Sequence, residues 1–284
     1  MRLPILWARI RAMNNPFELL ALDVDGTLVG ASGIISPRLR AALARVRERG
    51  IHICLCTGRP WAATQCYLAE LETRTPPVVL NGALVPPLDG GDPLVCHNLS
   101  LVAVELLVAE ARRHGDYLEL HTASDLYIEN LGTEGEYQQA KLGLRAIVGS
   151  FERLWERAPI LKAQYVIRSQ EQRERIETLG QTMAEQALFS WGVSPGFDGW
   201  FINVMQRGVE KSASLDVLLR ALSIPWKRVL AAGDSPSDLA YVQRAGFGVI
   251  MGNAPQSVRE QAPHVAPPVD QDGLAQVIEQ HALA

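Results

Sequence analysis

The sequence predicts an α/β fold with two parts: a Rossmann-like parallel sheet flanked by helices, and an α+β domain inserted into it. Three observations support this prediction. Short apolar runs alternate with amphipathic stretches over residues 17–83, the rhythm changes over residues 86–205, and the alternation returns after Gly208. Because strands that alternate with helices build parallel sheets, both ends of the chain are expected to share one sheet.

Each expected element of the N-terminal part has a local signal. Residues 17–25 form an apolar run between Asn-Pro and Asp-Gly, which is typical of a buried strand. Ser36 and Pro37 are the residue types of a helix N-cap and first helical position, and Gly50 is suited to end that helix. The remaining elements expected here are strands over residues 51–58 and 76–83 and a helix over residues 59–71.

The middle of the chain has the mixed pattern of an α+β domain, and it follows a turn-rich linker that contains Pro86-Pro87 and Asp89-Gly90-Gly91. The elements expected in it are helices over 101–115 and 171–186, a strand over 162–169, and pairs of strands over 116–130 and 187–205. The elements expected after it are helices over 211–222 and 237–246 and strands over 228–234 and 247–254.

These patterns divide the chain into four segments. Residues 13–85 and 201–284 are expected to form the α/β core, and residues 86–200 the inserted α+β cap domain. Residues 1–12 precede Met13 and the first strand, and we interpret them as an N-terminal extension that contributes nothing to the fold.

The composition excludes several classes of protein. Of 284 residues, 48% are hydrophobic, which is enough to build a core and excludes disordered and fibrous classes. The 27 basic and 31 acidic side chains give a net charge of −4 without a basic run, which argues against a nucleic-acid partner. No segment approaches the ~20 apolar residues of a membrane span. The N-terminus also lacks a secretory signal, so we expect a cytoplasmic protein without a membrane partner.

The cysteines indicate a reducing environment. Four cysteines are too few for a disulfide scaffold in a chain of this length. His52, Cys54 and Cys56 would share one face of a strand, and a metal site there remains an alternative. Since no second ligand pair follows at finger spacing, we expect Cys54 and Cys56 to be buried strand residues.

The strongest chemical signal is the segment Asp23-Val24-Asp25-Gly26-Thr27. Asp23 ends an apolar strand, at the carboxyl edge where open parallel sheets place their binding sites. Asp25 lies two residues further on and is expected to project to the same side. Gly26 permits the tight turn that follows. The segment therefore predicts two carboxylates that converge on one point.

Cationic and hydrogen-bond-donating groups follow other expected strands. Thr57, Gly58 and Arg59 come after residues 51–56 and open a helix, and their hydroxyl and backbone N–H groups are suited to bind a phosphoryl group. Lys211 opens another helix and supplies a point positive charge. The sequence thus predicts an anion site at the same edge of the sheet.

A second acidic cluster predicts a metal ion at that edge. Asp234 and Asp238 belong to the segment Gly233-Asp234-Ser235-Pro236-Ser237-Asp238, which follows an expected strand. Carboxylate clusters bind hard cations such as Mg²⁺, which takes oxygen ligands in octahedral geometry. We therefore expect Mg²⁺ as the cofactor.

These four motifs, in this order, resemble those of the haloacid dehalogenase superfamily of phosphotransferases. The sequence is most similar to the Cof-type sugar-phosphatase-like branch of that superfamily. The further matches to this branch are Thr57-Gly58-Arg59, Asn81-Gly82-Ala83, the segment from Met251 to Ala254, Asp272-Gly273 and the large domain between the second and third motifs. The resemblance covers nearly the whole chain from Phe17 onward.

One position departs from the branch. Its fourth motif normally carries Asn where this chain has Ser237, and that Asn often touches the phosphate or supports the metal shell. Serine is shorter and replaces it only in part. The departure puts metal affinity or substrate positioning in question at this position.

The resemblance implies a mechanism and a role for each residue. Asp23 would be the nucleophile that forms an aspartyl-phosphate, and Asp25 the general acid and base. Asp23, the backbone carbonyl of Asp25, and Asp234 would hold Mg²⁺. The phosphate ligands would be Thr57, Gly58 and Lys211; Asp238 and Ser237 would support Lys211 or the metal, and Asn81 and Arg59 are further candidates.

The implied activity is the hydrolysis of a small phosphorylated metabolite, a sugar phosphate or a nucleotide-like cofactor. A phosphotransferase or mutase would form the same aspartyl-phosphate and pass it to a hydroxyl group. A non-catalytic binding module remains a third hypothesis, and a signalling receiver domain is disfavoured because it needs no inserted cap. Substrate choice would be made by the cap, where His121, Arg168, Trp191 and Trp200 could each equally be packing or surface residues.

Overall fold

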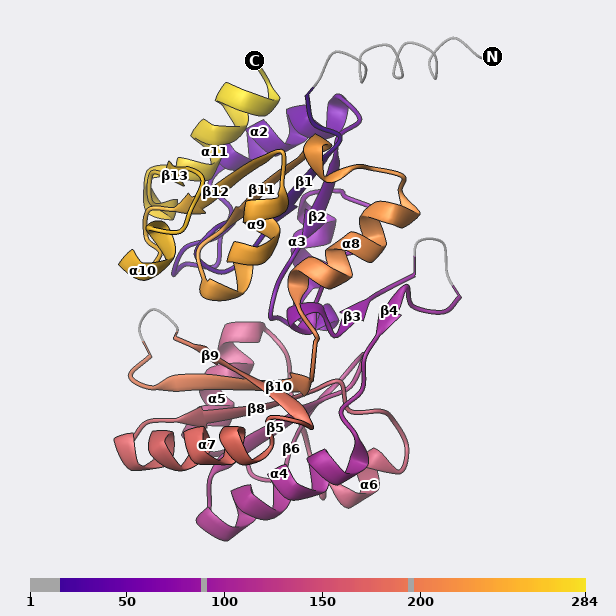
Figure 1. Cartoon of the computed structure of the whole chain (residues 1–284), viewed down its shortest axis with the longest axis vertical. Helices are drawn as coiled ribbons and strands as arrows, with labels where there is room; N and C mark the ends of the chain where they lie inside the picture. The colour runs from indigo at the N-terminus through magenta and orange to yellow at the C-terminus, as the bar shows by residue number, and fades with distance from the viewer. Residues whose placement is uncertain (1–15, 88–90, 194–196) are drawn as a thin grey trace.

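The computed structural model describes residues 16–87, 91–193 and 197–284, so the expected extension at residues 1–12 lies outside the described residues, as do Asp89 and Gly90 of the linker. The described chain forms a five-stranded sheet, a six-stranded sheet and a two-stranded ribbon between them (Figure 1). The predicted fold class is confirmed: an α/β core carries an inserted domain with a mixed sheet.

The core sheet is parallel throughout, with strand order β13-β12-β11-β1-β2. Its strands are β1 (Leu19–Leu22), β2 (His52–Leu55), β11 (Val229–Gly233), β12 (Phe247–Met251) and β13 (Val265–Ala266). Its helices are α2 (Pro37–Glu48), α3 (Trp61–Glu70), α8 (Lys211–Ala221), α9 (Leu239–Arg244), α10 (Gln256–Arg259) and α11 (Gly273–Val277). Strands from both ends of the chain are therefore neighbours, as predicted.

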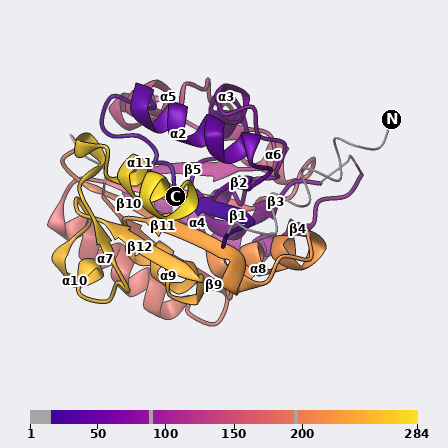
Figure 2. The ribbon, with the colours of Figure 1, turned by 90° about the horizontal axis from the view of Figure 1, so that it is seen from above.

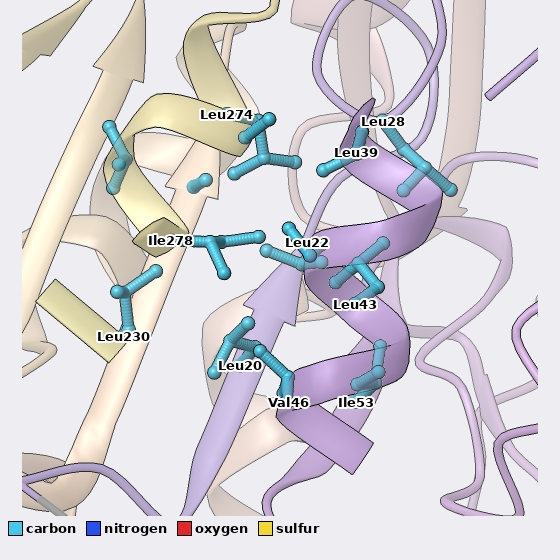
Figure 3. Packing of buried hydrophobic residues seen from close by; sticks show 14 of the residues in the cluster. Leu20, Leu22, Leu28, Leu39, Leu43, Val46, Ile53, Leu230, Leu274 and Ile278 are labelled. Carbon is cyan, nitrogen blue, oxygen red and sulfur yellow. The ribbon is translucent and has the colours of Figure 1, made fainter. Parts of the chain in front are cut away.

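Strand β1 is apolar at every position because helices cover both faces of the sheet. Leu20 and Leu22 pack on one side against α2 and α11 (Figure 3), whereas Leu19 and Ala21 belong to the cluster on the side of α8 and α9. Figure 2 shows the parallel strands between these two helical layers. The alternation of side chains along the strand distributes them to the two layers.

The expected capping of α2 is confirmed. Ser36 accepts a hydrogen bond from the backbone N–H of Leu39 at 3.1 Å, and Pro37 occupies the first helical position. Gly50 follows the helix with a φ of +76°, a conformation that residues with a Cβ rarely adopt.

Cys54 and Cys56 are buried in the core and are free thiols, as expected.

The strand expected over residues 76–83 is wrong. These residues make two isolated β-bridges, one between Val78 and Cys56 and one between Val79 and Leu84. Residues Leu80–Gly82 form a 3₁₀ turn, in which Leu80 and Asn81 have φ values of +51° and +56°. The turn is held by backbone hydrogen bonds from Leu80 to Arg59 and from Asn81 to Thr57. The chain then enters β3 (Leu84–Val85), which pairs antiparallel with β4 (Val95–Cys96).

The inserted domain contains a mixed sheet with strand order β7-β6-β5-β8-β10-β9. Its strands are β5 (Tyr117–His121), β6 (Leu126–Ile128), β7 (Ile147–Val148), β8 (Lys162–Ile167), β9 (Ala187–Gly192) and β10 (Trp200–Gln206). Its helices are α4 (Leu101–His114), α5 (Gly132–Leu142), α6 (Glu152–Trp155) and α7 (Gln170–Thr182). The sheet continues to Gln206, past the expected domain boundary at residue 200.

The two faces of this cap sheet differ in chemistry. Helices α4 and α7 cover the face turned away from the core (Figure 1), where an apolar cluster includes Leu118, Leu120 and Tyr165. Residues on the alternate positions, such as Glu119 and Gln164, belong to the opposite face and are polar.

None of the helices in the described ranges is both long and apolar enough to cross a membrane.

Candidate active site

Three adjacent strands place predicted residues at one edge of the core sheet. Asp23 follows β1, Thr57 follows β2 closely, and Asp234 follows β11, with β1 paired between the other two strands. The backbone N–H of Asp23 donates to Ala232 at 3.0 Å, which continues the ladder to β11. The parallel topology therefore gathers residues that are far apart in the sequence.

Lys211 joins two carboxylates at this edge. Its Nζ lies 2.7 Å from Asp23 Oδ1 and 2.7 Å from Asp238 Oδ1, and the lysine side chain is only 3% exposed. Asp238 Oδ2 accepts from the backbone N–H and the hydroxyl of Ser235 and from the N–H of Asp234. Both oxygens of Asp238 are thus engaged within the protein, and one of them holds Lys211.

The acidic residues outnumber the cations here, and their pKa values reflect it. Burial, together with the charges of Asp238 and Asp234, raises the pKa of Asp23 well above its usual value despite Lys211. Burial and the charge of Asp238 likewise raise the pKa of Asp234 to about 7. Burial acts to lower the pKa of Lys211, but the charges of Asp23 and Asp238 outweigh it and raise that pKa.

This excess of negative charge fits a metal cation. Oxygens of Asp23, Asp234 and Asp238 lie within 4.8 Å of one another. Since Asp238 is already engaged by Lys211 and Ser235, Asp23 and Asp234 are the residues that would hold the ion. Carboxylate oxygens are the ligands that Mg²⁺ prefers.

Asp25 is bound to Arg59 rather than directed at the other acids. Arg59 Nε and Nη2 each donate to one oxygen of Asp25 at 2.8 Å, a bidentate pair. Burial acts to raise the pKa of Asp25, but the hydrogen bonds and charge of Arg59 outweigh it and hold that pKa below its usual value. Asp25 is therefore ionised at neutral pH in this arrangement.

Thr57 and Gly58 form a loop with donors available. Thr57 Oγ1 accepts from the backbone N–H of Arg59 at 3.1 Å, which leaves the hydroxyl hydrogen free to donate. No acceptor for the Gly58 N–H is found in the described ranges. Asn81 braces this loop through its backbone N–H, which donates to the carbonyl of Thr57 at 3.0 Å. Its side chain lies so close that a Cβ on Gly58 would come within 2.6 Å of Asn81 Oδ1.

Asn253 was not singled out from the sequence, although the segment Met251 to Ala254 was. Its Nδ2 lies 2.9 Å from the carbonyl of Gly26 and 3.3 Å from Asp234 Oδ2, and its Oδ1 accepts from Val269. Asn253 therefore ties Asp234 to the turn after Asp25. Ser237 is exposed, and its hydroxyl is hydrogen-bonded to Ser235 at 2.8 Å rather than to any of the acidic residues.

Gly26 is required where it stands, and Gly26→Ala is expected to damage the site. An added Cβ would overlap the carboxylate of Asp234, and the φ of +84° is strained for alanine. We expect the reaction rate of this variant to be about 10²-fold lower than that of the wild-type protein, because a displacement of a reacting group by about 1 Å can have an effect of that size. Gly208→Ala is the matched control, since Gly208 has a φ of +81° and open space around its Cβ position. Equal activity of the two variants would contradict this expectation.

A cavity of about 150 Å³ lies between core and cap, and we call it the interdomain cavity. Its core side is formed by Asp25, Gly58, Arg59 and Pro60. Its cap side is formed by His121, Gln138, Lys141, Leu142, Lys162, Gln164, Gly192, Val193, Phe201 and Asn203. Asp25 thus lies at the junction between the acidic cluster and the cap.

Of the four cap candidates from the sequence, His121 is the one that lines this cavity. Arg168 pairs with Glu134 and lies over the ring of Phe197. Trp191 and Trp200 pack at the apolar cluster of the cap, beneath the guanidinium of Arg173. These three residues are packing and surface residues in this arrangement.

Apart from His121, sequence reasoning missed the polar side chains on the core-facing side of the cap sheet. Glu119 pairs in register with Gln164 and His121 with Lys162, so all four share one face of β5 and β8. Polar residues at alternate positions of two otherwise apolar strands are a signal that could have identified this face.

Comparisons with known proteins agree with this geometry. The family described as haloacid dehalogenase-like hydrolase matches residues 20–278. A 5-amino-6-(5-phospho-D-ribitylamino)uracil phosphatase of Bacillus subtilis is 25% identical and aligns over 95% of this chain and 99% of its own length. A phosphoglycolate phosphatase of Methanothrix thermoacetophila is 27% identical over 92% and 96%.

A solved structure supports the same assignment. A haloacid dehalogenase-like hydrolase from Bacteroides thetaiotaomicron superposes with a TM-score of 0.82 at 26% identity, over 93% of this chain and 99% of that one. The predicted resemblance is thereby confirmed in both sequence and fold. The chain belongs to the haloacid dehalogenase-like hydrolases, and the curated relatives described above are phosphatases.

Proposed function

We propose that this phosphatase is a Mg²⁺-dependent phosphomonoesterase that acts on a sugar phosphate or nucleotide-like metabolite through an aspartyl-phosphate on Asp23. The observation that carries the proposal is the position of Asp23. It is a buried carboxylate that lies beside Lys211 and Asp234 at the carboxyl edge of the core sheet. Asp25 and Gly58, which follow β1 and β2 at the same edge, line the interdomain cavity. A carboxylate in this setting is suited to attack phosphorus and to split hydrolysis into two steps.

In the first step, an oxygen of Asp23 forms a bond to phosphorus and the ester oxygen leaves with the phosphorus–oxygen bond pair. Lys211, the Thr57 hydroxyl and the Gly58 N–H bind the phosphoryl oxygens as their charge shifts. Mg²⁺, held by Asp23 and Asp234, would reduce the repulsion between the carboxylate and the phosphate.

Asp25 moves the protons in both steps. It donates a proton to the leaving alcohol and then accepts one from the water that hydrolyses the aspartyl-phosphate. Because Arg59 holds the pKa of Asp25 low, this ion pair has to loosen before Asp25 can carry a proton. The second proton transfer, from water to the carboxylate, agrees with the ionised state of Asp25 described above.

The proposal is tested by phosphate release from a broad panel of phosphomonoesters, with and without millimolar Mg²⁺. We expect Mg²⁺-dependent turnover of several small esters. The highest rate is expected on the esters that belong to the same chemical class as the protein's own substrate. Added alcohols and sugars form a second arm, because their phosphorylation would identify a transferase instead. Absence of turnover and of transfer from folded protein would contradict the proposal and favour a binding module.

Mg²⁺ is also expected to stabilise the protein against unfolding. The pKa of Asp234 rises from an ordinary value of 3.8 to about 7, so its ionisation costs stability as pH rises through this interval. At pH 8, Mg²⁺ at 100 times its dissociation constant should add about 2.7 kcal/mol to the free energy of unfolding. Thermal unfolding of Asp234→Asn should show higher metal-free stability and little response to Mg²⁺. An equal response in both proteins would exclude Asp234 as a ligand.

A further inference from the structure

A buried lysine of the cap has no part in the chemistry proposed above. Lys162 is the first residue of β8, and its side chain is only 3% exposed. Its Nζ donates to the backbone carbonyl of Gly58 at 3.2 Å, so this bond runs from the cap to the loop of the core that follows β2. Both residues also line the interdomain cavity.

Lys162 lacks the ion pair that a buried ammonium group usually has. Glu119 lies on the same face of the cap sheet, but its carboxylate is hydrogen-bonded to four other side chains. These are the side chains of Tyr117, His121, Gln138 and Gln164. Among the described residues, no carboxylate forms an ion pair with Lys162. A buried charge without an ionic partner costs stability, which favours a role in function over a role in packing.

The carbonyl that Lys162 binds belongs to the same planar peptide group as the backbone N–H of Arg59. That N–H donates to Thr57 Oγ1 at 3.1 Å, which leaves the hydroxyl hydrogen of Thr57 for the phosphoryl group. A bond from an ammonium group holds the carbonyl in one orientation. It also strengthens the linked N–H as a donor, because hydrogen bonds in a chain polarise one another. Lys162 is therefore connected to Thr57 through a single peptide group.

We propose that Lys162 is a positioning residue whose ammonium group fixes the Gly58–Arg59 peptide and so directs the Thr57 hydroxyl at the phosphoryl group. The inference rests on the proposed phosphatase function. It concerns the phosphoryl end of the substrate, which is the same in every phosphomonoester, and involves no contact with the leaving group. Because Lys162 belongs to the cap and Gly58 to the core, the phosphate-binding loop is complete only when the two parts are in contact.

The charge of Lys162 changes near neutral pH. Burial lowers its pKa to about 7; the charge of Glu119 opposes this shift, and those of Lys141 and Lys211 add to it. Strand β10, which pairs with this end of β8, carries no charged residue. The other titratable residues that line the same cavity are Asp25, Arg59 and His121. Above pH 7 Lys162 is a neutral amine, and its bond to Gly58 loses the contribution of the charge.

Lys162→Met and Lys162→Gln separate the hydrogen bond from the charge. Methionine offers no donor, so kcat/KM at pH 6.5 should fall about tenfold or more. Glutamine offers a neutral NH₂ donor and should give an intermediate value. The ratio of wild-type to Lys162→Gln kcat/KM removes the titrations that both proteins share. At saturating Mg²⁺ this ratio should decline from about five at pH 6 towards one at pH 8.5, as the wild-type lysine loses its charge.

The loss in Lys162→Met should be the same for every phosphomonoester. Phenyl phosphate, hexose 6-phosphate and phosphoglycolate are suited to this comparison, because their leaving groups differ in size, polarity and charge. Inorganic phosphate has no leaving group, and its inhibition constant should rise about threefold or more, because the loop that binds its oxygens is no longer held.

Stability distinguishes positioning from packing. Because the pKa of Lys162 falls from an ordinary value of 10.5 to about 7 on folding, its charge costs stability below pH 7, and this cost declines as pH rises from 7 to 10.5. Methionine avoids the cost, so the urea midpoint of Lys162→Met at pH 6.5 should equal or exceed that of the wild type. Arg157→Met is the matched control, because it removes a cation from an exposed position of the cap. It should change neither the rates nor their pH dependence.

Unchanged kcat/KM in Lys162→Met would overturn the inference and leave the phosphatase function intact. A loss confined to some of the esters would also overturn it, because it would place Lys162 at the leaving group. The same holds for a ratio of wild type to Lys162→Gln that is constant with pH, and for a lower urea midpoint in both variants, which would assign Lys162 to packing. Absence of turnover on every ester by the wild-type protein would instead overturn the proposed function and, with it, this inference.

Discussion

Asp23→Asn is expected to abolish phosphate release from every phosphomonoester, by at least about 10³-fold. The amide is nearly isosteric with the carboxylate but is a far weaker nucleophile, so the aspartyl-phosphate cannot form. Asp23 is 5% exposed and its neighbours are fixed by β1 and β11, so the variant is expected to fold. The substitution also removes one negative charge from an acidic cluster, which should keep the metal-free protein at least as stable at neutral pH.

The measurement is the initial rate at saturating Mg²⁺, with circular dichroism to confirm folding. Asp92→Asn serves as the control, because Asp92 is an exposed carboxylate in the segment that enters the cap. It should retain activity within about twofold, since surface substitutions rarely affect folding or chemistry. A rate in Asp23→Asn close to that of the control would show that another group attacks phosphorus.

Lys211→Met is expected to cause the largest combined loss of stability and activity. The side chain is 3% exposed and bonds Asp23 and Asp238, so methionine would leave two buried carboxylates without their cation. Removing one partner of a buried ion pair costs about 3–5 kcal/mol of unfolding free energy. Activity should fall by at least about 10²-fold, because the charge that binds the phosphoryl oxygens is lost.

Urea denaturation and initial rates together check this expectation. Lys227→Met is the control, since Lys227 is exposed in the turn before β11 and should lose less than about 0.5 kcal/mol. Unchanged stability in Lys211→Met would show that the two carboxylates are neutralised in another way. Higher Mg²⁺ concentrations should restore part of the stability, because the ion opposes the same excess of negative charge.

The sequence by itself was sufficient for the main strands and helices over residues 17–71 and 211–254 and for the acidic edge of the core sheet. The run at residues 17–25 is apolar on both faces because both faces are covered, and Ser36 and Pro37 cap α2 through bonds within one helical turn. Such signals depend only on residues that are close to one another in the sequence. They also placed Asp23, Thr57 and Asp234 after strands, and the parallel topology then brought those strand ends together.

The strand expected over residues 76–83 was wrong, and the elements missed include α5, β7, α6, α10, β13 and α11. For two of these segments, distant contacts give the reason. Residues 76–83 read as a strand, yet hydrogen bonds from Leu80 and Asn81 to the loop of Thr57 and Arg59 turn the chain after Val79. Helix α5 contains Gly132 and Gly135 in its first turns, and glycine weakens the local helical signal. Packing of Gly135 beside Tyr117 of β5 explains why a small residue is suited there.

The partners of the site residues were decided by the tertiary structure alone. Arg59 binds Asp25, Asn253 binds Asp234, and Glu119 holds side chains from three elements. Each contact depends on the register between strands, or on how the cap sits over the core. If one of these segments shifted relative to the other, the side chains would have different partners. No pattern within a single segment encodes the distances between segments. Residue types therefore indicated the chemistry, and packing between distant segments determined which atoms face one another.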